Sequence, residues 1–307
     1  MELVVPTCEK IGEMFLLILA GIVSCKAGLL DEAMSRKLSN LLLMVVCPCL
    51  IINSYQIDYR PELFTGLVLC LLFSGISFAL DVLVAHVVIR PDSGRDEAIE
   101  RMGIIYSNCA FIGIPLVEGV LGKEGVFYVT AYLTVFNTLV WTHGVSLMRG
   151  KGTLRESLGH LNTPTIYAIG LGLLLFFSQI RLPALLAGPV ASLSALNTPL
   201  AMLIAGVNLA GSDIWGSMKN PRIYWIGFVK LIIIPLVTLA MLILLRADRT
   251  AAFVVFICAA CPTGAMTTLF ALKYNRNARY ASEAFCSTTI FSLITMPVLT
   301  LLAGVVL

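Results

Sequence analysis

Long apolar runs separated by short polar connectors extend along nearly the whole 307-residue chain. A helix that crosses a bilayer needs about 20 mostly apolar residues. The pattern therefore predicts ten transmembrane helices and an all-α polytopic membrane protein. The predicted helices cover residues 11–30, 38–57, 62–90, 98–121, 125–148, 164–181, 184–211, 222–245, 250–272 and 281–305.

The ten predicted helices divide into two halves with a common plan. Helices 2 and 7 each contain a proline, Pro48 in VVCPCLI and Pro199 in LNTPLAM. Helices 4 and 9 each contain a Gly–Pro interruption, with Pro115 in NCAFIGIPL and Pro262 in AACPTGAM. Because each half has five helices, the halves would cross the membrane in opposite orientations, as in the inverted repeats of many secondary transporters.

The two predicted repeats are residues 1–150 and residues 151–307. The composition and the positions of the charged residues predict how the chain is oriented in a membrane. The chain is 58% hydrophobic and 13% charged, against about 25% charged residues in a soluble domain. Odd-numbered connectors carry thirteen Lys and Arg residues, whereas the even-numbered connectors and the N-terminus carry six. The positive-inside rule then predicts a cell-membrane protein with both termini on the extracytoplasmic side. The net charge of +3, without a basic tract, gives no reason to expect a nucleic-acid partner.

The interruptions in helices 4 and 9 predict a polar site near the middle of the membrane. Proline removes a backbone N–H and clashes with the preceding turn. In lipid, the freed backbone groups must be satisfied by protein or by a water-filled cavity. Each interruption also exposes the N-terminus of a half-helix, whose free N–H groups and dipole favour an anion. Asn108 adds an amide and Thr263 a hydroxyl, so the site suits a small organic anion.

Four other side chains have candidate roles inside the membrane. Asn53 and Asn208 lie a few residues after the paired prolines. They either line the substrate site or form hydrogen bonds between helices. Asp81 and Lys230 each lie nine residues from a predicted cytoplasmic helix end, which is about 13 Å deep. An isolated charge there costs at least about 2.5–3.5 kcal/mol. We therefore predict an ion pair that tunes coupling, with Asp81 as the proton carrier. The alternatives are that each charge faces water separately or that Lys230 extends to the interface.

Metal and enzyme chemistry have weaker support in the sequence. The CPC at 47–49 and the CAAC at 258–261 offer soft metal ligands. A metal pump, however, also needs a phosphorylation domain, and no such motif is present. The chain has no His-Glu-x-x-His motif and no paired aspartates within the membrane. We therefore predict no metal site, no cofactor and no enzyme activity.

The interrupted helices also carry a family resemblance. NCAFIGIPL resembles the N-x-x-x-x-G-I-P-L element of the auxin efflux carrier family, and CPTGAMTTLFALKYN resembles its second crossover. TPLAMLIAGVNLA is similar to its seventh helix, and the resemblance covers nearly the whole chain. It implies a ten-helix inverted-repeat fold like that of the bile-acid symporters and sodium/proton antiporters. Helices 1, 2, 6 and 7 would form a dimerising scaffold, and helices 3–5 and 8–10 a moving transport domain.

The same resemblance implies a function. It implies elevator-type secondary transport of a small organic anion such as malate, malonate or an auxin-like acid, with a coupling proton or sodium ion. It carries over Asn108, Pro115 and Pro262 as site and crossover residues. The short connector at 149–163 favours a bacterial-type carrier, because many plant members have a long loop there. A non-transporting membrane sensor on the same fold is the alternative. The complete predicted substrate site comprises Asn108, Gly113, Pro115, Pro262, Thr263, Gly264, Asn53 and Asn208.

Overall fold

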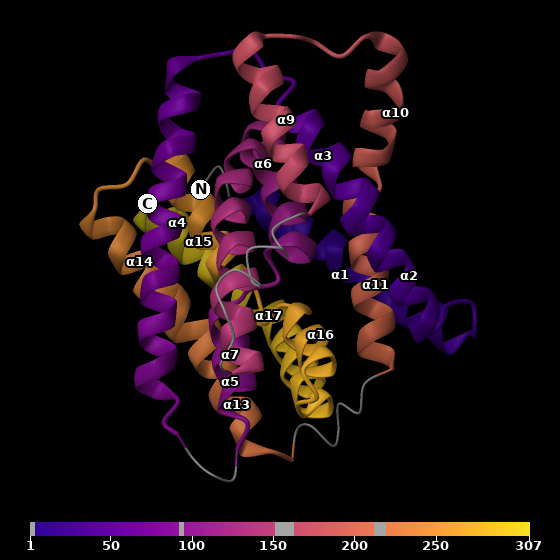
Figure 1. The fold of residues 1–307 in the computed structure, drawn as a ribbon, viewed down its shortest axis with the longest axis vertical. Coiled ribbons are helices and arrows are strands. Elements are labelled where there is room, and N and C mark those ends of the chain that lie inside the picture. Colours follow the sequence, from indigo (N-terminus) through magenta and orange to yellow (C-terminus); the bar gives the residue numbers. More distant parts are fainter. Residues whose placement is uncertain (1–3, 92–94, 151–162, 212–218) are drawn as a thin grey trace.

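The computed structural model describes residues 4–91, 95–150, 163–211 and 219–307, and within them the regular structure is helical (Figure 1). Helices labelled η have a π-helical turn. The first half contains α1 Val4–Lys26, α2 Glu32–Leu41, η1 Leu42–Val46, α3 Cys47–Ser54, α4 Pro61–Val88, α5 Glu97–Ile105, η2 Cys109–Gly113, α6 Ile114–Leu139, η3 Val140–Gly144 and α7 Val145–Arg149. The second half contains α9 Pro164–Ser178, α10 Ala184–Ala195, α11 Asn197–Ala210, α13 Pro221–Phe228, η5 Val229–Ile233, α14 Ile234–Leu244, α15 Arg249–Ala260, α16 Met266–Lys273 and α17 Ala278–Val306. The predicted boundary between the repeats, at 150 and 151, adjoins residues 151–162, which lie outside the described part.

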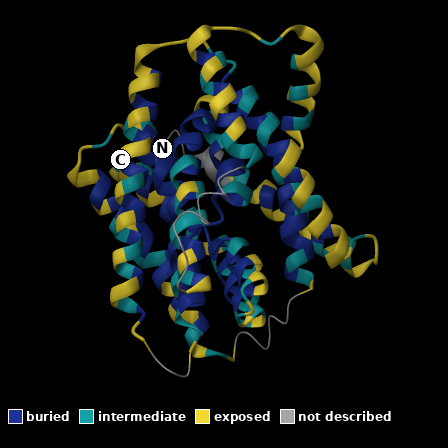
Figure 2. Ribbon diagram, in the orientation of Figure 1, coloured by how far each residue is buried: buried dark blue, intermediate teal, exposed yellow. Residues whose placement is uncertain are grey.

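Several of these helices have the length and apolarity of membrane spans. Five in the described part are long and apolar enough to cross a bilayer: Glu32–Ser54, Pro61–Val88, Ala184–Ala210, Pro221–Leu244 and Ala278–Val306. Large apolar side chains are exposed on the outer faces, among them Leu72, Leu174 and Leu185 (Figure 2). An apolar exterior of this kind is typical of a protein surrounded by lipid. The fold is thus that of a polytopic membrane protein, and the count of ten spans stays a prediction.

The helices pack mainly in two groups. In the first group α1 lies along α11, and α3 packs against α9 and α10. In the second group α15 lies among α4, α6 and α14, and α5, α13 and α16 pack against α17. Every residue of α15 from Ala251 to Ala260 is buried. The groups meet where α1 contacts α6 and α17, and where α11 contacts η2.

Three π-helical segments each end two residues before a proline. They are η1 before Pro48, η2 before Pro115 and η5 before Pro235. The proline has no N–H and its ring clashes with the carbonyl four residues earlier. A wider π turn accommodates this clash without ending the helix. The prolines therefore widen helices locally, and a complete interruption needs more than a proline.

The observed ends of the first helix differ from the predicted range of 11–30. In the described residues the helix extends from Val4 to Lys26. Gly28 has a φ of 72°, which only glycine adopts without strain, and it turns the chain towards α2. A similar residue, Gly122 with a φ of 60°, introduces a kink in α6 between the predicted fourth and fifth helices.

The crossing of α1 and α11 brings two backbones into contact. A Cβ added to Gly21 would lie 2.4 Å from the Leu203 carbonyl oxygen, and one added to Gly206 would lie 2.2 Å from that of Ile18. We expect Gly21→Ala to separate the helices and to destabilise the protein by about 1–3 kcal/mol, measured as a lower thermal midpoint in detergent. Gly12→Ala on the same helix is the control, because its added Cβ would meet nothing within 4 Å. Equal midpoints for the two variants would contradict this account of the crossing.

Candidate functional site

Two segments interrupt helices in the middle of the second packing group. The chain leaves α5 at Tyr106 and re-enters helical structure at Cys109. It leaves α15 at Cys261, which has an extended backbone (φ −59°, ψ 149°), and α16 begins at Met266. Pro262, the second residue after the end of α15, has no N–H to continue the helical hydrogen bonds. The second interruption falls on its predicted motif of Pro262 and Gly264, whereas the first lies at residues 106–108, before Gly113 and Pro115, which are helical.

The two interrupted segments lie antiparallel and exchange backbone hydrogen bonds. The Asn108 N–H donates to the Pro262 carbonyl oxygen at 2.7 Å, and the Gly264 N–H donates to that of Tyr106 at 2.8 Å. Ser107 and Thr263 face each other across this bridge. A Cβ at Gly264 would lie 3.1 Å from two carbonyl oxygens of the opposite segment, so the close approach favours glycine. Each segment therefore satisfies part of the backbone that the other leaves unpaired.

The other predicted residues at the crossing are buried around this bridge. Asn108 is 5% exposed, and its side chain does not cap the following helical turn. No other side-chain partner is seen for it in the described residues. The Thr263 hydroxyl donates to the Gly103 carbonyl oxygen at 2.9 Å, so this group is already used by the protein. Gly113 lies beside the thiols of Cys258 and Cys261. The amide of Asn108 is thus the group at the crossing best placed to bind a ligand.

Asn53 and Asn208 are both engaged in hydrogen bonds between helices. The Asn53 amide nitrogen donates to the Ser194 hydroxyl at 3.4 Å, and its oxygen accepts from the Lys123 ammonium at 3.3 Å. The Asn208 amide oxygen accepts from the Ser35 hydroxyl at 2.8 Å. Both asparagines therefore form hydrogen bonds between helices, which was one of the two predicted roles. The other role, contact with the substrate, stays a prediction for each residue.

The two deep charges, Asp81 and Lys230, are both completely buried. The Lys230 ammonium donates to the Ser107 hydroxyl at 3.1 Å and to the Ala259 carbonyl oxygen at 3.3 Å, and it does not extend to the surface. Neither carboxylate oxygen of Asp81 has a hydrogen-bond partner in the described residues. No hydrogen bond or ion pair joins the two groups in the described residues. Their predicted role in coupling therefore stays a prediction.

Comparison with known proteins identifies the family. Models of the family described as "Membrane transport protein" match residues 6–158 and 153–300. The chain belongs to this family. The resemblance of the interrupted motifs to the auxin efflux carrier family is thereby confirmed.

Two archaeal relatives of this transporter match over almost their full lengths. An uncharacterised transporter of Methanothermobacter thermautotrophicus is 25% identical over 301 residues, which cover 94% of this chain and 96% of the relative. One of Methanocaldococcus jannaschii is 23% identical over 301 residues, covering 92% and 94%. The chain is therefore a multi-pass membrane transporter and not an enzyme.

A buried asparagine of the transporter, Asn197, is not among the predicted site residues. Asn197 begins α11 and is completely buried, and its side-chain nitrogen has no hydrogen-bond partner in the described residues. Its side-chain oxygen accepts from the Cys47 thiol at 3.5 Å. Its helix α11 packs against η2, which begins directly after Asn108, so Asn197 lies on a helix next to the crossing. In the sequence, its position two residues before Pro199 could have marked it as a candidate site residue.

A charged network that the sequence did not reveal joins three helices of the transporter. Glu100 on α5 is completely buried. The Arg222 guanidinium donates to both of its carboxylate oxygens at 2.7–3.1 Å, and the Tyr280 hydroxyl donates to one of them at 2.9 Å. This bidentate pairing fixes the beginnings of α13 and α17 against α5.

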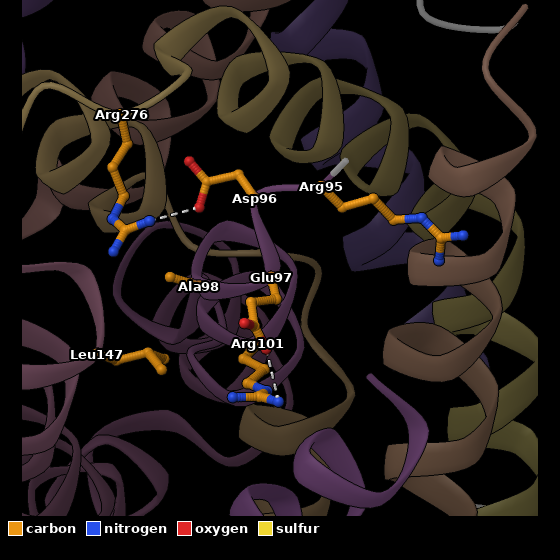
Figure 3. A pocket seen from close by; sticks show the side chains of 7 residues that line it. All are labelled: Arg95, Asp96, Glu97, Ala98, Arg101, Leu147 and Arg276. Carbon is orange, nitrogen blue, oxygen red and sulfur yellow. Dashed lines mark hydrogen bonds and ion pairs between the residues drawn. The ribbon is translucent and has the colours of Figure 1, made fainter. Parts of the chain in front are cut away.

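A polar cavity of about 500 Å³ lies at the opposite end of α5 from the crossing (Figure 3). Its lining residues are Arg95, Asp96, Glu97, Ala98, Arg101, Leu147 and Arg276. Arg276 pairs with Asp96 at 2.8 Å, and Arg101 pairs with Glu97 at 2.8 Å. Because Asp96 binds Arg276, its side chain does not cap α5. Three arginines and two carboxylates line the cavity, so it carries a small excess of positive charge.

Proposed function

We propose that this transporter moves a small organic anion across the cell membrane and binds it where the two interrupted helices cross. The observation that carries the proposal is the Asn108 side chain, which lies at the crossing in a residue that is 5% exposed and forms no hydrogen bond with the described residues. Its amide N–H groups are therefore available to a ligand. A ligand that accepts a hydrogen bond from this amide gains that bond without breaking one inside the protein, and a carboxylate is such a ligand.

The electrostatics of the crossing favour a carboxylate. The helical segments that begin at Cys109 and Met266 start at the crossing, so their N-terminal N–H groups and positive dipole ends lie beside it. The cavity at the start of α5, with three arginines and two carboxylates, adds a small excess of positive charge at the other end of that helix. Both features support a mono- or dicarboxylate, which includes malate-like, malonate-like and auxin-like acids.

The packing supports alternating access by an elevator mechanism. The two packing groups correspond to the proposed scaffold of helices 1, 2, 6 and 7 and the proposed transport domain of helices 3–5 and 8–10. The third and eighth predicted helices both begin at a proline, Pro61 and Pro221, which fits a 5+5 inverted repeat of ten spans. In this proposal, the crossing moves with the transport domain, and two copies dimerise through their scaffolds.

The experiment is a thermal-shift screen of purified protein against organic acids, followed by flux measurements. A ligand at 100 times its Kd stabilises the folded state by about 2.7 kcal/mol, so the substrate should raise the thermal midpoint measurably. The same acid should then accumulate in proteoliposomes that contain the protein and exchange with unlabelled acid. Stabilisation by an acid without any flux would instead assign the chain as a sensor.

The predicted orientation can be tested separately. An epitope attached after Leu307 should bind antibody on intact cells, because the excess of Lys and Arg lies in the odd-numbered connectors. An epitope inserted after Leu29, in the first connector, should become accessible only after permeabilisation. The reversed result for the two epitopes would invert the proposed topology.

A further inference from the structure

The two helix interruptions leave matching backbone carbonyls without their helical partners. Gly103 and Ala259 each lie four residues before a bridge residue, Ser107 and Thr263 respectively. In an unbroken helix the N–H of each bridge residue would donate to that carbonyl. At the second interruption the Thr263 N–H donates instead to the Thr288 hydroxyl at 3.2 Å. The Ala259 carbonyl oxygen therefore needs another donor.

The two halves satisfy these carbonyls with groups of different charge. The Gly103 oxygen accepts from the hydroxyl of the opposite bridge residue, Thr263. By the same plan the Ser107 hydroxyl would donate to the Ala259 oxygen. Instead the Lys230 ammonium lies between these two groups and donates to both, at 3.1 Å to Ser107 and at 3.3 Å to Ala259. The carbonyl of Gly103 in the first half thus accepts from a neutral hydroxyl, whereas the carbonyl of Ala259 in the second half accepts from a positively charged ammonium.

The surroundings of this ammonium are those of a monovalent-cation site. Ala259 belongs to the last turn of α15, where unpaired carbonyls form the negative end of the helix dipole. Asp81 is a second completely buried charge, of opposite sign, and neither of its carboxylate oxygens has a hydrogen bond in the described residues. Carbonyls at half-helix C-termini are the groups that hold sodium ions or protons in secondary transporters.

We propose that Lys230 is a resident counter-cation, whose ammonium fills a monovalent-cation position at the crossing, so that transport needs no external sodium. The inference rests on the proposed function for its flux measurement alone. The cation position itself is tested by protein stability, which does not depend on any substrate. The failure of one proposal can therefore be distinguished from the failure of the other.

The flux experiment compares wild-type uptake in sodium with uptake in N-methylglucamine, a cation too large for the position. We expect the initial rates to agree within about twofold, because the position is already occupied. A loss of about tenfold or more on removing sodium would overturn the inference and leave organic-anion transport standing.

The stability experiment removes the Lys230 ammonium from the proposed cation position. In Lys230→Ala the ammonium and its side chain are removed, and sodium or methylammonium should raise the thermal midpoint relative to N-methylglucamine at equal ionic strength. Wild type and Lys26→Ala, which changes an exposed lysine at the end of α1, should show no such difference. Lys230→Met fills the space without a charge and should also not respond.

The result decides the inference even if Lys230→Ala folds poorly. In that case the variant is expressed and purified with methylammonium present, which should restore a cooperative unfolding transition. A variant that no small cation stabilises, or that responds no more than Lys26→Ala, would show that Lys230 does not occupy a cation position. Cation-specific stabilisation without any organic-acid flux would support the inference and count against the proposed function.

Discussion

Asn108→Ala is expected to weaken substrate binding by about 10- to 100-fold while leaving the protein folded. A hydrogen bond to a charged group contributes about 1.5–3 kcal/mol, and the Asn108 amide has no partner in the described residues that its removal would leave unpaired. The loss should therefore appear in ligand affinity and not in the stability of the unliganded protein. The measurement is a thermal-shift titration with the identified acid, followed by the KM for uptake.

Asn137→Ala provides the matched control. Asn137 lies on α6, and its amide donates to the Leu133 carbonyl oxygen within the same helix at 2.8 Å. This variant should have nearly wild-type affinity for the acid. Wild-type uptake by a correctly inserted Asn108→Ala protein would remove Asn108 from the site.

Lys230→Met is expected to cause the larger loss of stability. The substitution would leave the Asp81 carboxylate as a buried charge without a compensating cation, a change that costs about 3–5 kcal/mol. Asp81→Asn should cost less, because the ammonium would keep its contacts with Ser107 and Ala259. Both variants should transport poorly, and both effects are measured as unfolding midpoints and initial uptake rates.

The double variant Asp81→Asn/Lys230→Met tests whether the two charges interact. Groups that are electrostatically coupled give interaction energies of about 0.5–3 kcal/mol. The double variant should therefore be more stable than the sum of the two single changes predicts. Strict additivity would show that the residues act independently and would end the proposal of a shared role in coupling.

The helix interruptions could be predicted because their causes are local. A proline removes its own N–H whatever surrounds it, so Pro262 marked the second irregular segment directly, whereas Pro115 lies in a helix seven residues after Asn108, where the first irregular segment ends. The membrane character followed from equally local apolar runs. Pro48 and Pro115 nevertheless also follow π turns, and the difference between a widened helix and an interrupted one depends on the residues that pack against it.

The partners of side chains across the bundle could not be predicted. The hydroxyl of Ser107 meets Lys230, which is 123 residues away in the chain, and nothing near either residue specifies that contact. Asn53 and Asn208 had the same two interpretations in the sequence, and only packing showed their interhelical hydrogen bonds. The burial of Glu100 could not be predicted either, because the bidentate partner that allows it, Arg222, lies in the other half of the chain.

The bridge at the crossing has a consequence for how such a protein can diversify. Its two short contacts, Asn108 to Pro262 and Gly264 to Tyr106, join main-chain atoms only. Main-chain hydrogen bonds persist through most side-chain replacements. Apart from the requirement for glycine at 264, mutation can therefore change the groups presented to a ligand without separating the two segments. Descendants of one ancestral carrier can in this way acquire new cargo specificities on an unchanged architecture.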